Sequence, residues 1–369
     1  MTENGFLQRV RHNCDISDAR DCGIYSLCTL VLKLRNLYKW EHGLQPWQEP
    51  ESAELLDWIA AKEDYWETIS GDTFQHLPVN GKDIDPFSQQ SANQMLFKTG
   101  QVYGAGYGRS MKAVFFIGEI VEQKTVDGCP AIILGKETAR ELSSPFAMLQ
   151  DGIIYIRKEP MRFYFWDHIQ ETIPSCKSAK HYALDSYGVL NDNLGINHDL
   201  LVERFDRLID REMDIFIYHE VGEMHEDILD SSTLKKIIHA FPDSPIELLA
   251  RSVKDILADT HEKGLISHII AHRKKSSLGF YRIFLDGMRK MLCKDFIDAC
   301  TFFWKTENWN SMEKARQKCR DNNLALADKL NVLSRKLDKE EPENLKGWTE
   351  REILAPLGLQ APGSGAETN

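Results

Sequence analysis

The sequence predicts a predominantly helical α+β protein: an N-terminal helical segment, a small antiparallel-sheet module and a C-terminal irregular helical bundle. Apolar residues recur at helical spacing before residue 70 and again after about 178, whereas the period between 96 and 171 falls to two, as in strands. A chain of 369 residues is also long enough for two or three cores. We therefore expect four parts, at 1–70, 96–171, 178–337 and 338–369.

The first 70 residues are expected to be helical. Ser17 and Asp18 have the side chains of an N-cap and precede a long apolar segment. Apolar residues lie on two stripes of that segment, which predicts a helix buried on most sides. A second helix is expected at 52–68, packed on the first.

The middle of the chain reads as a linker followed by strands. Glycine and proline punctuate residues 71–95, as in a linker. Short strands are expected at 101–107, 112–122, 131–134 and 152–157. Asp127 and Gly128 form the dipeptide of a type I′ hairpin turn between two of them. Helical turns are expected at 137–142 and 145–150.

After residue 178 the pattern is helical again. Helices are expected at 197–210, 212–229, 231–239, 245–261, 265–273, 277–306 and 312–337. Short loops between them indicate an irregular bundle. The charged residues from 338 read as a linker, and 361–369 has the composition of a flexible tail.

The bulk composition excludes several classes of function. A net charge of −11 argues against binding to nucleic acid or to anionic membranes. Eight cysteines without a CxxC pair indicate reduced thiols in a cytoplasm. The sequence has no apolar leader segment and no run of about 18 apolar residues, so we expect neither secretion nor a membrane span.

The stretch 211–227 concentrates the side chains that bind metals or move protons, and it has no lysine. On a helical wheel, Glu220 lies about 60° from the centre of the apolar stripe. Burying a carboxylate costs several kcal/mol unless it is paired, protonated or bound to a cation. His219 and Glu223 lie on the same helix. The alternative is an exposed acidic face with one salt-bridged Glu.

A second expected helix, 245–261, carries Arg251, Asp255 and Asp259 at intervals of four. Facing helices that bring carboxylates and histidine together are how di-metal sites are built in helical bundles. This predicts five metal ligands, His219, Glu220, Glu223, Asp255 and Asp259, with Glu220 and Asp259 also catalytic. Their carboxylates are expected within about 8 Å of each other. Alternatively, Arg251 simply pairs with Asp255 or Glu220.

Three further features of the sequence are candidate sites. His261, His268 and His272 would share one face of an unbroken helix, which Gly264 interrupts. A basic set surrounds Phe280-Tyr281 and would suit an anionic ligand or a solvated face: Arg273, Lys274, Lys275, Arg282, Arg289, Lys290 and Lys294. A phosphohydrolase of the His-Asp type would use His181, His219 and Asp259, but His219 is followed by Glu rather than Asp.

Two stretches carry a resemblance: Asn-Cys-Asp-Ile-Ser-Asp-Ala-Arg at 13–20 with Tyr-Lys-Trp-Glu-His at 38–42, and Tyr-His-Glu-Val-Gly-Glu at 218–223. The sequence resembles an uncharacterised bacterial family of unknown function (Sfum-type) over most of its length. The resemblance implies a bacterial cytoplasmic protein and brings no reaction, cofactor or catalytic residue.

Two functions fit these observations. The first is a metal-dependent enzyme whose carboxylate/histidine site in the bundle holds a divalent ion (Fe, Mn or Zn) that activates water or oxygen. The second is a non-catalytic scaffold or regulatory protein that binds a protein or anionic partner. The sequence leaves open whether the chain is an enzyme, and it indicates a small-molecule or protein partner without naming one.

Overall fold

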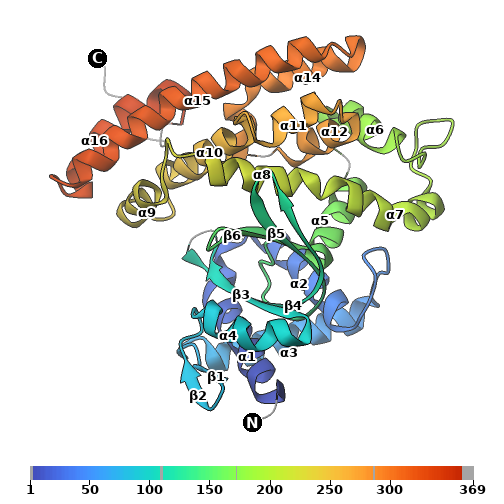
Figure 1. The fold of residues 1–369 in the computed structure, drawn as a ribbon, viewed down its shortest axis with the longest axis vertical. Coiled ribbons are helices and arrows are strands. Elements are labelled where there is room, and N and C mark those ends of the chain that lie inside the picture. The colour runs from blue at the N-terminus through green and yellow to red at the C-terminus, as the bar shows by residue number, and fades with distance from the viewer. Residues whose placement is uncertain (1–2, 109–110, 172, 286, 360–369) are drawn as a thin grey trace. The chain divides into compact units, whose positions relative to one another are not determined.

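The computed structural model describes residues 3–108, 111–171, 173–285 and 287–359. Contacts divide the chain into two compact units. The first contains Met1–Glu171 and Phe205–Asp210, and the second contains Thr172–Arg204 and Arg211–Asn369. The predominantly helical α+β fold expected from the sequence is confirmed (Figure 1). The expected division at 1–70, 96–171, 178–337 and 338–369 stays a prediction, because contacts do not test independent folding.

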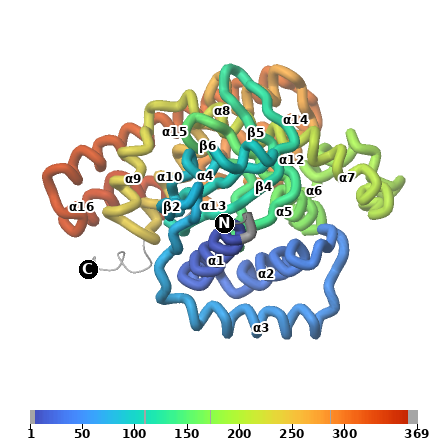
Figure 2. The backbone as a smooth tube through the Cα atoms, turned by 60° about the horizontal axis from the view of Figure 1, so that its bottom comes forward, coloured from blue at the N-terminus to red at the C-terminus, as the bar shows by residue number. Residues whose placement is uncertain are grey.

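Three helices open the first unit: α1 (Glu3–Asp21), α2 (Leu27–Glu41) and α3 (Ser52–Ile69). Figure 2 shows them lying side by side, with α1 and α2 both contacting α3. The prediction that Ser17 and Asp18 cap a helix is wrong, because α1 continues through both residues. Their polar side chains face the sheet instead of a helix end.

The cap of α2 is Ser26, whose hydroxyl accepts a hydrogen bond from the Thr29 N–H. This helix is less buried than its two apolar stripes predicted. Leu34 and Leu37 are buried, but 76% of Leu27 is exposed. The prediction failed because no described part of the chain covers the stripe around Leu27.

The expected linker at 71–95 is structured. Strands β1 (Leu77–Val79) and β2 (Lys82–Ile84) form an antiparallel hairpin, followed by α4 (Gln89–Leu96). Leu77 and Val79 are buried in the same core as α1. The turn residues that suggested a linker belong to the hairpin, where Asn80 and Gly81 have φ of 50° and 80°.

A curled sheet follows, with the order β3-β4-β5-β7-β6. Its strands are β3 (Gln101–Tyr107), β4 (Ala113–Val126), β5 (Cys129–Arg140), β6 (Ala147–Gln150) and β7 (Ile153–Arg157). Only β5 and β7 pair in parallel among these strands. Asp127 and Gly128 both have positive φ, as the predicted hairpin turn requires.

Helical turns were predicted at 137–142 and 145–150, and the structure contradicts both. Strand β5 extends to Arg140 through a register shift against β4, and Ala147–Gln150 is a strand. The irregular pairing interrupts the period of two, which is why the sequence pattern stopped reading as a strand there.

Alternate residues of β4 supply cores on both faces of the sheet, as strand geometry requires. Phe115 and Ile117 pack with side chains from α1 and α4. Val114 and Phe116 pack on the opposite face with apolar side chains of β5 and β7. Helix α5 (Lys158–Gln170) directly follows β7 and packs on β5.

The second unit is an irregular bundle. Its helices are α6 (Lys177–Asp185), the ends of α7 (His198–Glu212), α8 (Asp214–His225), α9 (Ser231–Ala240), α10 (Pro245–Thr260), α11 (Leu265–Ala271), α12 (Lys275–Phe284), α13 (Gly287–Leu292), α14 (Lys294–Thr306), α15 (Trp309–Leu337) and α16 (Pro342–Thr349). The single helix expected at 277–306 is broken into parts.

Helices α8 and α10 approach closely because Gly222 has no side chain. A Cβ at Gly222 would lie 2.1 Å from the Ala258 carbonyl oxygen. Helix α10 also packs on α15 and forms the main core of the bundle with it.

Part of the expected C-terminal linker is helical. Helix α16 is followed by further helical turns at Glu350–Leu354 and Ala355–Leu357, and Leu345 and Ile353 are buried in the bundle core. The flexible tail expected at 361–369 lies outside the described residues. Within the ranges that the structure describes, no helix has the length and apolar character needed to cross a membrane.

Candidate functional site

A cavity of about 560 Å³ opens in the first unit among α1, α2, α3, β5 and the start of α5. This volume lies in the range of small-molecule sites. Its lining is rich in charged side chains beside an apolar wall: Arg11, Cys14, Asp15, Asp18, Leu37, Trp40, Glu41, Gly43, Lys62, Lys136, Glu137, Thr138, Arg140 and Glu159.

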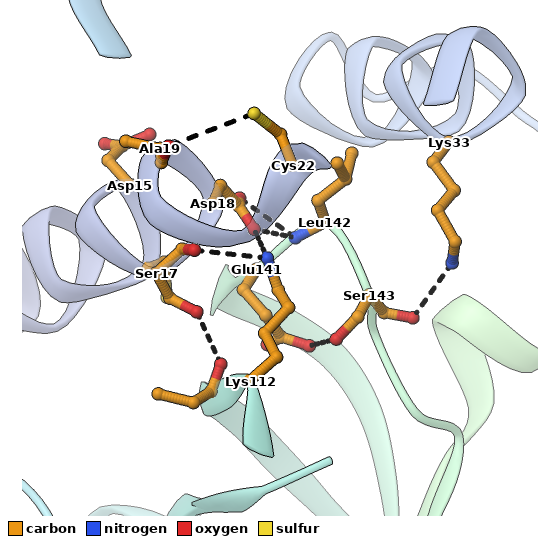
Figure 3. Close-up of polar contacts among 12 residues, drawn as sticks. Asp15, Ser17, Asp18, Ala19, Cys22, Lys33, Lys112, Glu141, Leu142 and Ser143 are labelled. Atoms are coloured by element: carbon orange, nitrogen blue, oxygen red, sulfur yellow. Dashed lines mark hydrogen bonds and ion pairs between the residues drawn. The ribbon is translucent and has the colours of Figure 1, made fainter. Parts of the chain in front are cut away.

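The inner wall is built on an ion pair between Asp18 of α1 and Lys112 at the start of β4. The carboxylate lies 2.8 Å from the Lys112 ammonium, and both side chains are only 2% exposed. The Leu142 N–H donates to both carboxylate oxygens, at 2.9 and 3.0 Å (Figure 3). Burial raises the pKa of Asp18 to about 6, against the opposing effect of Lys112 and Leu142. Asp18 therefore changes protonation near pH 6, whereas Lys112 stays charged, because its pKa is raised.

A second polar layer lies behind the first. Glu141 accepts hydrogen bonds from the Ser143 hydroxyl at 3.1 Å and the Ser144 N–H at 2.6 Å. The Lys33 ammonium donates to the Ser143 carbonyl oxygen at 3.3 Å (Figure 3), and burial lowers the pKa of this lysine. These contacts fix the segment after β5 against α2.

Arg157 and Glu137 form a fully buried, two-point ion pair. The guanidinium donates through Nε and Nη2 to the two Glu137 oxygens, at 2.5 and 3.1 Å. Its face lies over the Phe116 ring at 4.2 Å. Glu137 therefore has its counter-charge within the protein.

Arg140 is the unusual member of the cavity wall. Its guanidinium stacks over the rings of Trp40 and Phe163, at 4.7 and 5.4 Å from their centroids. Nη2 donates to the Asn36 carbonyl oxygen at 3.1 Å, but Nε and Nη1 are buried and have no partner among the described residues. Burial lowers the pKa of Arg140 to about 10, although Glu137 and Glu159 oppose this. Stacking uses the faces of the guanidinium and leaves these two donors unsatisfied.

Apart from Glu159, whose carboxylate has no ion-pair partner among the described residues, the other charges of the wall divide into paired acids and unpaired bases. Lys62 bridges Asp15 and Glu41, at 3.1 and 3.0 Å. Arg11 donates from Nε to the Thr138 carbonyl oxygen and forms no ion pair with a described residue. Lys136 likewise has no ion-pair partner in the described chain. Basic groups with spare donors thus surround the cavity.

Sequence reasoning missed this site. It read Ser17 and Asp18 as the start of a helix, and it placed Arg140 in a helical turn. A lysine at position 112 at the start of an apolar strand was the available signal, because a charge on an inward face of a sheet needs a buried partner.

The predicted carboxylate and histidine residues lie in the second unit, on α8 and α10. His219 Nδ1 lies 2.8 Å from Asp259 Oδ1, and the Tyr281 hydroxyl donates to Asp259 Oδ2 at 3.0 Å. Glu223 pairs with Lys254. The structure thus places the predicted residues on two contacting helices, but it engages several of them in contacts with each other or with cations.

Glu220 and Asp255 are the least satisfied members of this cluster. The carboxyl group of Glu220 is buried and makes no hydrogen bond or ion pair with a described residue. Burial raises its pKa to about 7 and also raises the pKa of Asp255. The alternative pairing with Arg251 is wrong for both acids, because Arg251 pairs with Glu247 at 2.9 Å.

The prediction of a metal-dependent enzyme is wrong. Over the described ranges, no group of three or more His, Cys, Asp or Glu side chains is arranged to hold a metal ion. Asp259 uses both oxygens within the protein, and Glu223 is held by Lys254. Asp259 also raises the pKa of His219 to about 10, overcoming the effect of burial. The His-Asp phosphohydrolase variant falls with this prediction.

The other sequence candidates are also structural. His261, His268 and His272 do not share one helix, because α10 ends at Thr260 and α11 begins at Leu265. His268 stacks on Tyr218 at 3.5 Å. The basic set is divided among separate partners, with Lys274 bound to Asp214 and Lys275 to Glu307.

The fold and cavity define an α+β protein of two units, the first of which contains a charged cavity of ligand size. Family models cover both units. The N-terminal domain of the family of unknown function DUF6866 matches residues 5–157, and its C-terminal domain matches residues 162–352. The chain therefore belongs to this family, which confirms the expected membership of a family of unknown function. No curated protein and no solved structure matches the chain.

Proposed function

We propose that the first unit binds a small molecule through a carboxylate or phosphate group, which Arg140 receives in the cavity. The observation that supports this most is the pair of buried Arg140 nitrogens without a partner. A buried donor that lacks a hydrogen bond costs about 1–3 kcal/mol, and more when it is charged. An anion that accepts from one of these nitrogens would relieve part of that cost through a charge-assisted hydrogen bond.

The charge around Arg140 supports an anion rather than a metal cation. Asp18 and Glu137 already have buried counter-charges in Lys112 and Arg157. Arg11 and Lys136 line the same cavity and add positive charge without ion-pair partners in the described chain. A ligand with a negative group therefore finds three basic side chains.

The shape of the cavity supports a ligand with an apolar part. Leu37 and Trp40 line the wall beside Arg140. A volume of about 560 Å³ is larger than a simple inorganic anion needs. The ligand class that fits is a small organic acid or phosphate ester.

The sequence led us to expect an unspecified small molecule or protein as the partner, and we now propose a small anionic molecule. We also propose that the protein is bacterial and cytoplasmic. All eight cysteines are free thiols, which suits a reducing compartment.

Thermal unfolding at constant ionic strength tests the proposal. The probes are inorganic phosphate, acetate, butyrate and 3-phenylpropionate. A ligand at one hundred times its Kd stabilises the native state by about 2.7 kcal/mol, which raises Tm by several degrees. We expect saturable stabilisation that grows with the apolar part of the acid. The absence of saturable stabilisation by every probe would contradict the proposal.

Variants locate the binding. Arg140→Gln should abolish the stabilisation, and Arg140→Lys should weaken it, because lysine keeps the charge but lacks the planar array of guanidinium N–H donors. Arg35→Gln is the matched control, since Arg35 is paired with Asp167 at 2.7 Å and does not line the cavity. If Arg140→Gln does not fold, Arg140→Lys decides. Unchanged binding in the Arg140 variant that folds would overturn the assignment.

A further inference from the structure

We infer that the ligand is an amino-acid-like zwitterion, whose negative group is received by Arg140 and whose ammonium group is received by Glu159. This inference rests on the proposed function and narrows it to a substrate class. It follows from Glu159, a second charged side chain of the cavity wall that has an oxygen without a hydrogen bond among the described residues.

Glu159 lies in the first turn of α5 and lines the same cavity as Arg140. Its Oε2 atom accepts hydrogen bonds from the Trp40 indole N–H at 3.1 Å and the Glu137 backbone N–H at 2.8 Å. Its Oε1 atom accepts none from the described residues, and the carboxylate has no ion-pair partner among them. Two neutral donors orient this carboxylate without neutralising it.

Arg140 and Glu159 do not satisfy each other. They are close enough to interact electrostatically, but no ion pair forms within 4.0 Å. Trp40 separates their roles, because its ring stacks on the Arg140 guanidinium while its N–H holds Glu159. A ligand that carries both charges can occupy the two groups at once.

The remaining charges agree with a dipolar ligand. Asp15 and Glu41 share one lysine, Lys62, so this side of the cavity keeps a surplus negative charge. Arg11 and Lys136 give the opposite surplus. A simple anion on Arg140 would be repelled by Glu159, whereas an added ammonium group converts that repulsion into a charge-assisted hydrogen bond.

Three probes of matched shape test the inference by titration calorimetry on the full chain at pH 7. L-Phenylalanine carries both charges, 3-phenylpropionate lacks the ammonium group, and 2-phenylethylamine lacks the carboxylate. A hydrogen bond to a charged group predicts that L-phenylalanine binds roughly 10- to 100-fold more tightly than 3-phenylpropionate. We expect 2-phenylethylamine to bind more weakly than L-phenylalanine as well, because Arg140 stays unpaired.

Glu159→Gln should remove the advantage of L-phenylalanine and leave 3-phenylpropionate bound at least as tightly as in the wild type. Glu122→Gln, on β4 and outside the cavity, is the matched control. An advantage that survives in Glu159→Gln would overturn the role of Glu159. If that variant does not fold, the comparison of probes on the wild type decides the inference.

The outcomes separate the two proposals. Wild-type protein that binds 3-phenylpropionate as tightly as L-phenylalanine would overturn the zwitterion and leave the anion site standing. Wild-type protein that binds none of the three probes would overturn the zwitterion. The anion site would then be contradicted only if the phosphate and carboxylate series also fails.

Discussion

His219 and Asp259 form an ion pair that joins α8 to α10, with 2.8 Å between Nδ1 and Oδ1. The second oxygen of Asp259 accepts the Tyr281 hydroxyl, which adds α12 to the same junction. The acid lies in the bundle interior while 20% of the His219 side chain stays exposed. His219, from the stretch 211–227, and Asp259 thus help to join three helices.

The protonation of His219 tests this structural role. Burial alone would lower its pKa, but Asp259 overcomes that effect and raises the pKa to about 10. The stabilisation is fully present below the ordinary pKa of about 6.5 and is lost as pH rises towards 10. We expect the imidazole NMR signals of His219 to remain those of the cation at pH 8. Titration with a midpoint near that of a free histidine would contradict the ion pair, and Asp259→Asn should produce that midpoint.

Glu220→Gln should become relatively more stabilising as pH rises. Burial raises the pKa of Glu220 to about 7, so the native state binds more protons than the unfolded state between about pH 4.5 and 7. Wild-type stability falls over that window, by at most about 3 kcal/mol for this shift. The variant lacks this ionisable carboxyl group, so it does not lose stability in this way over the same pH window. Urea unfolding at pH 4.5 and 8 should show a change in the stability difference of that order in favour of Gln, and an unchanged difference would contradict the buried, unpaired carboxyl.

The secondary structure was predictable where burial is one-sided and pairing is regular. Strand β3 and helix α3 match their expected positions because each has an uninterrupted period. The hairpin at β1 and β2 was missed because a strand of three residues has no period to detect. The extension of β5 was missed because its register shifts against β4.

Asp18→Asn should strand a buried cation. The Lys112 ammonium is 2% exposed and would lose its only ion-pair partner among the described residues, at a cost of about 3–5 kcal/mol. The cost should be smaller at pH 8 than at pH 5, because burial raises the pKa of Asp18 from 3.8 to about 6, so the wild type loses stability as pH rises through that window and the variant does not. Urea unfolding measures both values.

The double change Asp18→Asn with Lys112→Met is the control for that experiment. It removes both charges, so it should recover most of the lost stability. A single variant that costs less than about 1 kcal/mol would resemble a surface pair and contradict the buried one.

Metal content tests whether the acids and histidine of α8 and α10 bind a metal ion. Because Asp259, Glu223 and His219 are engaged with one another or with cations, we expect no stoichiometric Fe, Mn or Zn in dialysed protein. The same reasoning predicts that added Zn²⁺ leaves Tm unchanged, with Glu220→Gln as the comparison. Stoichiometric metal in the wild type that is lost in Glu220→Gln would contradict this expectation and show a metal site in the bundle.

The candidate site residues, like the secondary structure, were only partly predictable from the sequence. Helical spacing correctly placed His219 and Asp259 on packed helices, but spacing does not reveal whether an acid already has a partner. Arg140 and Glu159 are nineteen positions apart on different elements, and only the fold brings them to one cavity. Their importance lies in missing hydrogen bonds, which no sequence pattern records.

The most direct test of the anion site is a crystal structure of the protein grown with 3-phenylpropionate. We expect carboxylate density in the cavity, with one oxygen about 2.7–3.2 Å from Arg140 Nε or Nη1. The phenyl ring should lie against Leu37 and Trp40. A cavity without the acid at a saturating concentration would contradict the anion site at Arg140.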